Sequence, residues 1–160
     1  MNDDGAAHDD LGQLAGFLPY QLSVASNAVS SLIAERYRKR FALKIPEWRV
    51  MAVLGDAGTM TQRDLTAATV MDKVAVNRAV KVLEERGLIA RVPNPGDGRS
   101  HLLELTGEGR AIHAEVMPLA RATERELLAE LAPGEEAMLR QLLAQMRSRA
   151  DQLARAAVSQ

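Results

Sequence analysis

Four polar side chains recur along one edge of a stretch near the middle of the chain. Lys73, Asn77 and Lys81 are spaced by four residues, and Arg78 lies beside them. In a helix of 3.6 residues per turn, this spacing places all four on one side. Asparagine can bond the N6/N7 edge of adenine, and arginine or lysine the O6/N7 edge of guanine. The pattern therefore indicates a helix that can read base pairs.

Val74 is an apolar residue in the middle of this polar face. Packing gives no reason for it, whereas a thymine methyl in the major groove is an apolar target. Glu84 and Glu85 lie further along and would repel phosphate, so the contact is expected in the first turns. The alternative is a solvated helix face, on which Lys–Glu pairs contribute only ~0.3 kcal/mol each.

A loop rich in proline and glycine, 93–100, follows between two apolar segments, which indicates a hairpin. Arg99 follows the tip of this loop, and Asp97 precedes it by two residues. A carboxylate at that position can hold a guanidinium in a fixed direction. A directed arginine suits a narrow, A·T-rich minor groove, where the negative potential is enhanced. The alternative is an exposed loop salt bridge worth about 0–1 kcal/mol.

The spacing of apolar residues, together with residues that cap or break helices, predicts the elements that would position these side chains. Val76, Ala79, Val80 and Leu83 form an apolar edge that should face the core, and Asp72 should cap this helix. The predicted helices and strands follow in chain order: helices over 19–41, from 46 to the glycines at 55 and 58, over 61–68 and over 72–86, strands over 88–92 and 101–105, and helices over 106–131 and 135–153.

The predicted fold is mainly α with a small β-wing, a winged helix-turn-helix with long N- and C-terminal dimerisation helices. We expect a disordered acidic tail at 1–10, a dimerisation helix at 11–42, a DNA-binding module at 43–106 and further dimerisation helices at 107–160. A module this small cannot cover three long apolar stripes. They are therefore expected to pair with a second copy in a twofold contact, although packing within one chain is the alternative.

Charge is distributed unevenly along a chain whose net charge is only −1. Residues 35–49 hold six basic and two acidic residues, and residues 72–101 hold six basic and four acidic ones. This distribution suggests a local anion-binding surface. Aromatic residues make up only 3% of the chain, which argues against stacking on single-stranded bases.

Several kinds of chemistry are absent from the sequence. There is no cysteine, which excludes disulfides and thiol redox chemistry. His8, His101 and His113 have no metal-ligand spacing, and no nucleophile elbow or phosphate-cradling glycine motif occurs, so we expect no enzyme, cofactor or metal site. No apolar run approaches the ~20 residues of a membrane span, and no secretory signal is evident, so a cytoplasmic protein is expected.

The chain resembles the MarR (multiple antibiotic resistance regulator) family of winged helix-turn-helix transcription factors. The matching stretches are IPEWRVMAVL (45–54), TQRDLTAAT (61–69), RAVKVLEERGLIAR (78–91) and DGRSHLLELTGEGR (97–110). The resemblance implies an obligate homodimer on pseudo-palindromic DNA sites, usually a repressor that a small ligand releases. It puts Asp97 and Arg99 on the wing and Asn77 and Arg78 on the reading helix. Gly98 stands where arginine is often found, and Asn77 where threonine or serine is common.

The resemblance also implies a ligand crevice between the dimerisation helices and the DNA-reading module, for phenolic or aromatic carboxylates or larger acyl conjugates. Arg36 and Arg40, one helical turn apart, could bind a carboxylate or phosphate. For Tyr37 and Trp48 the alternative is core packing, and for His113 a surface or lightly buried position. The candidate ligand-binding residues are Tyr20, Ser30, Arg36, Tyr37, Arg40, Trp48 and His113.

The sequence therefore predicts a ligand-responsive, DNA-binding transcriptional regulator that acts as a homodimer and is released by a small aromatic or phenolic acid or its conjugate. The candidate DNA contacts are Lys73, Val74, Asn77, Arg78 and Lys81 on the helix, with Asp97 and Arg99 on the wing. The alternative is a dimeric protein-interaction module without sequence-specific DNA binding.

Overall fold

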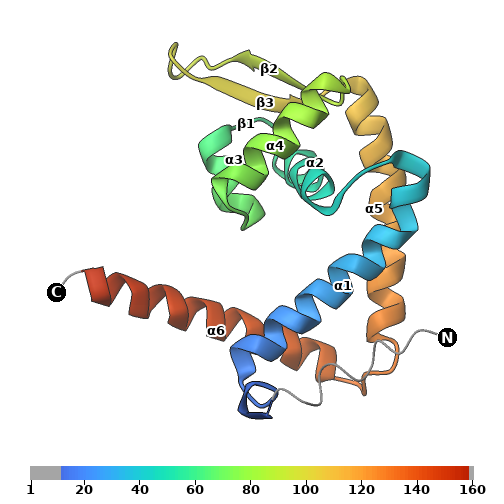
Figure 1. Ribbon diagram of the computed structural model, residues 1–160, viewed down its shortest axis with the longest axis vertical. Helices are drawn as coiled ribbons and strands as arrows, with labels where there is room; N and C mark the ends of the chain where they lie inside the picture. The colour runs from blue at the N-terminus through green and yellow to red at the C-terminus, as the bar shows by residue number, and fades with distance from the viewer. Residues whose placement is uncertain (1–11, 159–160) are drawn as a thin grey trace. The chain divides into compact units, whose positions relative to one another are not determined.

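The chain is mostly helical, with a small antiparallel sheet (Figure 1), which confirms the predicted fold class. The computed structural model describes residues 12–158, so the acidic tail expected at 1–10 lies outside the described residues. Two compact units, Met1–Arg121 and Ala122–Gln160, meet within one long helix. This boundary lies later in the chain than the end of the DNA-binding module predicted at residue 106.

The elements of the first unit follow the predicted order, with two additions, the short helix η1 and strand β1. Strand β1 was not predicted, because two residues are too few to show an alternating pattern. The elements are the short 3₁₀ helix η1 (Gly12–Leu14), α1 (Leu18–Phe41), α2 (Ile45–Ala57), β1 (Met60–Thr61), α3 (Gln62–Thr69), α4 (Lys73–Glu85), β2 (Ile89–Pro93), β3 (His101–Leu105) and α5 (Gly107–Leu128), which continues into the second unit.

The predicted caps fix the starts of α3 and α4. The Asp72 carboxylate accepts the Ala75 N–H at 2.8 Å, and the Thr61 hydroxyl oxygen accepts the Asp64 N–H at 3.1 Å. Such caps satisfy orphan donors of the first turn and typically contribute about 1 kcal/mol each. Each helix therefore begins at a capped residue, and Asp72 also ends the short connection between α3 and α4.

The apolar edge of α4 is buried as predicted, with Val76, Ala79, Val80 and Leu83 in the core. The inward face of α3 differs from the prediction: Ala68 is exposed and Thr69 is buried in its place. The Thr69 hydroxyl donates to the Leu65 carbonyl at 2.9 Å, which satisfies the buried polar group. A polar residue can thus replace the expected alanine in the core.

The sheet has the order β1–β3–β2, and both pairings are antiparallel. Met60 and Arg91 both pair with Leu103, on opposite sides of β3. After β3, Thr106 bonds the Gly87 and Leu88 carbonyls and accepts the Gly109 N–H. A Cβ on Gly109 would lie 2.0 Å from the Leu88 carbonyl oxygen, so glycine is required where α5 meets the wing base.

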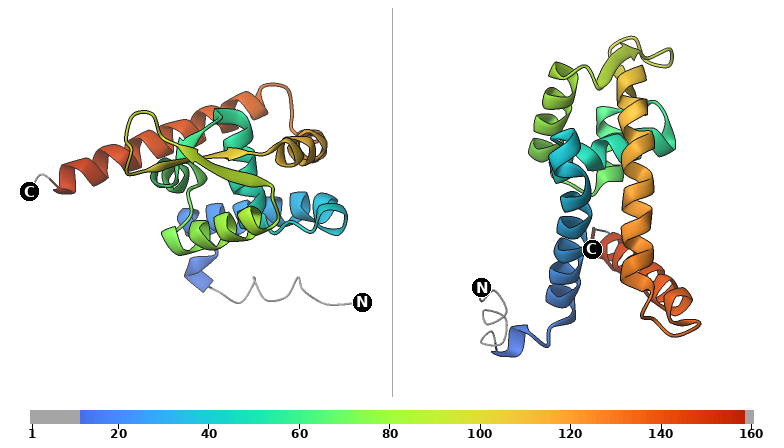
Figure 2. Two further views of the ribbon diagram at one scale, coloured as in Figure 1. Left: turned by 90° about the horizontal axis from the view of Figure 1, so that it is seen from above. Right: turned by 90° about the vertical axis from the view of Figure 1, so that its right-hand side faces the viewer.

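The C-terminal part of α1 lies next to the first part of α5 (Figures 1 and 2), and Arg40 forms an ion pair with Glu115 between them. Arg86, just after α4, donates to the last carbonyls of α1, those of Phe41 at 2.7 Å and Ala42 at 2.9 Å. The end of the candidate reading helix is therefore fastened to the end of α1.

The second unit contains the end of α5 and helix α6 (Glu135–Val158), which extends beyond the predicted 135–153. Arg140 joins the two helices by bonding Glu124 and Glu136, each at 2.8 Å. No residue of α6 is buried. Its exposed large apolar residues are Met138, Leu139, Leu142, Leu143, Met146, Leu153 and Val158. No described helix is long and apolar enough to cross a membrane.

Candidate nucleic-acid interface and ligand-binding residues

The polar face predicted for 72–86 lies on the solvent side of α4. Its five candidate residues, Lys73, Val74, Asn77, Arg78 and Lys81, are all exposed, and 57% of the Val74 surface is open to solvent. An apolar side chain this exposed beside four polar ones is consistent with a contact to a thymine methyl. DNA contact by these residues remains a prediction.

Lys81 and Glu85 form the kind of ion pair that the alternative interpretation requires. Their charged atoms are 3.9 Å apart, one helical turn along α4, and both side chains are largely exposed. Such a pair contributes only about 0.3–0.5 kcal/mol. It therefore does not prevent Lys81 from turning toward a phosphate.

The wing tip is built differently from the prediction. The Asp97 carboxylate accepts the backbone N–H of Arg99 at 3.0 Å and does not hold its guanidinium. Asn94 accepts the Gly96 N–H at 3.0 Å and donates to the Ser100 hydroxyl at 2.7 Å. A carboxylate two residues before a backbone N–H closes an Asx turn more readily than it reaches a long side chain. Asp97 thus shapes the loop that presents Arg99.

A hollow of about 370 Å³ opens between α3 and α4 on the same side as the polar face. It is lined by Gln62, Arg63, Thr66, Lys73 and Asn77. The two cations make it suitable for a phosphate or for the edge of a groove.

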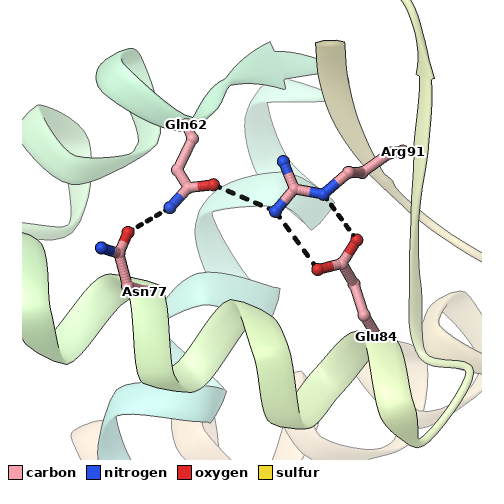
Figure 3. A network of polar contacts seen from close by, with 4 residues as sticks. All are labelled: Gln62, Asn77, Glu84 and Arg91. Atoms are coloured by element: carbon pink, nitrogen blue, oxygen red, sulfur yellow. Dashed lines mark hydrogen bonds and ion pairs between the residues drawn. The ribbon is translucent and has the colours of Figure 1, made fainter.

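Glu84 does not act as the free negative charge expected from the sequence. Its carboxylate is bound by Arg91 of β2, with contacts of 2.7 and 3.2 Å from Nε and Nη2 (Figure 3). The Arg91 guanidinium compensates the charge that was expected to repel phosphate.

Sequence reasoning missed Gln62, Arg63 and Arg91 as members of this surface. For Arg63 a signal existed, because it is a basic residue in the first turn of α3, two residues after the capping residue Thr61. For Gln62 and Arg91 no local pattern could reveal the contact, since they lie 29 residues apart in the chain.

Three of the seven candidate ligand-binding residues form one aromatic stack. Trp48 lies between Tyr37 and His113, with ring centroids 5.7 Å apart in each pair. Tyr37 and Trp48 are buried in the core, as the core-packing alternative expected, and His113 is partly buried. A Cβ on Gly55 would lie 2.3 Å from Nε2 of His113, so the imidazole sits directly against the backbone of α2.

Ser30 lies near this stack and meets a residue that the sequence did not single out. Arg49, half-buried on α2, donates to the Ser30 hydroxyl at 3.1 Å. Burial raises the pKa of the Tyr37 phenol to about 12, against the opposing charges of Arg38 and Arg49. Tyr37 therefore stays neutral at physiological pH beside a cation that could bind a carboxylate.

The other candidates lie apart from the stack. Tyr20 is 17 residues before Tyr37, about 25 Å along α1 at 1.5 Å per residue. Arg36 and Arg40 are exposed, and the Arg40 guanidinium is paired with Glu115 and lies 4.9 Å from the centroid of the Phe41 ring. The seven residues do not form one cluster. Within residues 12–158, no group of three or more histidine, aspartate or glutamate residues could hold a metal ion.

Comparison with known proteins gives consistent matches. A family model described as MarR family matches residues 43–100. The chain spans about half the length of the first curated relatives it matches. One is the transcriptional repressor NicR of Pseudomonas putida, 35% identical over 44% of this chain and 45% of NicR.

Solved structures match over nearly their whole length. A MarR family transcriptional regulator from Silicibacter pomeroyi DSS-3 is 31% identical, with a TM-score of 0.70 over 83% of this chain and 97% of that one. A mutant MarR from Escherichia coli complexed with operator DNA is 26% identical, with a TM-score of 0.72 over 81% and 92%. Bordetella bronchiseptica BpsR, whose DNA binding is regulated by 6-hydroxynicotinic acid, is 26% identical, with a TM-score of 0.73 over 82% and 93%.

Proposed function

The chain belongs to the MarR family of transcriptional regulators, and we propose that it is a repressor that binds a pseudo-palindromic operator as a homodimer. In this proposal a small aromatic or phenolic acid, or its conjugate, releases the protein from DNA. The single observation that carries the proposal is the exposed polar face of α4 next to a wing that ends in Arg99.

Two grooves would be read by each half of the dimer. Helix α4 would enter the major groove with Lys73, Val74, Asn77 and Arg78 toward the base edges. Arg99 would reach the neighbouring minor groove from the wing tip. Its guanidinium has no ion-pair partner within the described residues, so it remains available for phosphate or base contacts.

The homodimer is supported by the exposed apolar residues of α6. Such residues would be covered by a second copy across a twofold axis. A twofold dimer places its two reading helices in successive major grooves, roughly 34 Å apart, which matches a pseudo-palindrome.

For the effector, support comes from the neighbourhood of Arg49. A half-buried guanidinium that donates to the Ser30 hydroxyl provides a partner for a carboxylate. The regulation of BpsR by a hydroxylated aromatic acid agrees with this chemistry. A ligand that favours the wrong spacing of the reading helices, with a coupling of ~1–3 kcal/mol, would give about 5–150-fold derepression.

The test is selection of duplexes from a random pool by the full chain, followed by titration at several salt concentrations. Arg99→Ala should weaken binding to all duplexes and reduce the salt slope by about 1. Asn77→Ala should relax discrimination at one position of each half-site by about 1–3 kcal/mol. Hydroxylated aromatic acids are then screened for release of the selected duplex.

Arg125→Ala is the matched control, because it removes one exposed positive charge from α5 outside the proposed interface. It should leave base preference unchanged. If the full chain shows no salt-dependent binding to any duplex, the proposal fails and the protein-interaction module becomes the better description.

A further inference from the structure

Four polar side chains from α3, α4 and β2 form a continuous chain of contacts, here called the amide relay: Glu84, Arg91, Gln62 and Asn77 (Figure 3). Arg91 binds the Glu84 carboxylate through Nε and Nη2, and its Nη2 also donates to Oε1 of Gln62 at 3.2 Å. Gln62 in turn donates from Nε2 to Oδ1 of Asn77. The relay ends on the helix face proposed to read bases.

The chemistry of the first two members fixes the direction of the other two. Glu84 only accepts, and the Arg91 guanidinium only donates, so the Gln62 amide has to turn its oxygen toward Arg91. Its nitrogen then faces Asn77, whose side-chain oxygen has to accept the hydrogen bond. The Asn77 amide nitrogen is left pointing away from the relay, as Figure 3 shows.

We infer, on the basis of the proposed DNA-binding function, that Glu84, Arg91 and Gln62 are positioning residues that make Asn77 a hydrogen-bond donor toward the major groove. A donor aimed at the exocyclic position of a base fits the keto oxygens, O6 of guanine and O4 of thymine, whereas adenine offers it only N7, next to an amino group. It is opposed by the amino groups of adenine and cytosine. Asn77 therefore reads a keto base, in place of the adenine edge that residue type alone suggests.

Duplex selection with the full chain tests this inference, and Asn77→Ala first locates the half-site position that Asn77 reads. At that position the wild type should prefer guanine or thymine by roughly 5-fold, the low end of the range for a base contact, because only the Asn77 nitrogen is free to bond.

Gln62→Glu then inverts the relay with little change of shape. A carboxylate at residue 62 only accepts, so it keeps its bond to Arg91 and requires the Asn77 amide to turn its nitrogen inward. The outward group becomes an acceptor, and preference at this one position should switch to adenine or cytosine. The added negative charge should also lower affinity for all duplexes.

Arg63→Gln is the matched control, because it changes the charge of the same hollow by one unit without touching the relay. It should lower affinity for all duplexes and keep the keto preference. If the wild type selects duplexes with adenine or cytosine at this position, or if Gln62→Glu keeps the keto preference, the relay inference is overturned while DNA binding stands. If the wild type binds no duplex at all, the proposed function fails and the inference falls with it.

Discussion

Burial changes the acid–base behaviour of His113 more than its place on a long amphipathic helix suggests. The imidazole stacks on Trp48 at an interplanar angle of 28° and touches the α2 backbone at Gly55. Within the described residues its Nε2 has no hydrogen-bond partner. Desolvation lowers the pKa of His113 below its ordinary value of 6.5, and the Asp56 charge opposes this only in part. The ring is therefore neutral in the folded protein near pH 7.

This lowered pKa predicts a loss of stability in mild acid. Below pH 6.5 the unfolded chain binds a proton at His113 that the folded chain resists, so the free energy of unfolding falls as pH decreases through this window. One proton gives a slope of at most about 1.4 kcal/mol per pH unit. Urea unfolding between pH 7.5 and 5 should show a smaller decrease for His113→Gln than for the wild type.

His101→Gln is the control for that measurement, because His101 is exposed at the start of β3. It should retain the full pH dependence of the wild type. An identical pH dependence for His113→Gln and the wild type would contradict the assignment.

For single residues, the solvent exposure of a side chain could be predicted from the sequence, whereas its hydrogen-bond partners could not. Helical spacing sufficed to place Lys73, Asn77 and Lys81 on the solvent side of α4. The Asp97 carboxylate was expected to hold a guanidinium and holds a backbone N–H. The bond between Gln62 and Asn77 depends on how α3 and α4 cross, which residue types do not encode.

Among the elements, α1 and α4 are joined at their C-terminal ends by one side chain. Ala42 ends α1 in the left-handed region at φ 50°, which turns its carbonyl and that of Phe41 toward Arg86. The Glu47 carboxylate, 4.0 Å from Arg86 and buried, also accepts the Lys44 N–H at 2.9 Å. One arginine thus connects the end of α1, the start of α2 and the end of α4.

Arg86→Met should therefore destabilise the fold by about 1.5–3 kcal/mol, because it removes two charge-assisted bonds and leaves two carbonyls without their donors. Chemical denaturation measures this change. Arg78→Met, which removes an exposed arginine from α4, should change stability by no more than about 0.5 kcal/mol. Equal stabilities of the two variants would refute the structural role of Arg86.

Element starts were predictable because caps are local signals. Asp72 and Thr61 each act on an N–H three residues later, within the reach of a sequence window. Strand β1 and the close approach of Gly109 to Leu88 are long-range features that no such window contains. The glycine of the L-T-x-x-G pattern could be recognised as part of a motif, but its reason becomes clear only in three dimensions.

For the molecule as a whole, the two units differ in how they use their apolar residues. The first unit has a closed core that includes Tyr37, Val50, Leu65 and Leu103. In α6, by contrast, Leu139 and Leu142 are about half exposed. Periodicity predicted these stripes correctly. It could not locate the boundary between Arg121 and Ala122, because that boundary interrupts no helical pattern.

The proposed homodimer predicts that Leu142→Glu will produce monomers, because a carboxylate buried in an apolar contact has a high desolvation cost. Light scattering after size-exclusion chromatography should show half the wild-type mass, and operator binding should weaken. Gln141→Glu adds the same charge at the neighbouring position of α6 and should remain dimeric. A monomeric wild type, or a dimeric Leu142→Glu variant, would rule out this interface.

Strand β1 makes the wing and the reading helices one piece. Thr61 pairs with Leu102 of β3 and also caps α3, so the hairpin and the start of the helical pair share a residue. In the proposed complex this pairing couples a movement of the wing to a movement of α3 and α4. We therefore expect the wing and α4 to bind and leave a half-site together. A regulatory ligand then has to displace α3, α4 and the wing as one unit.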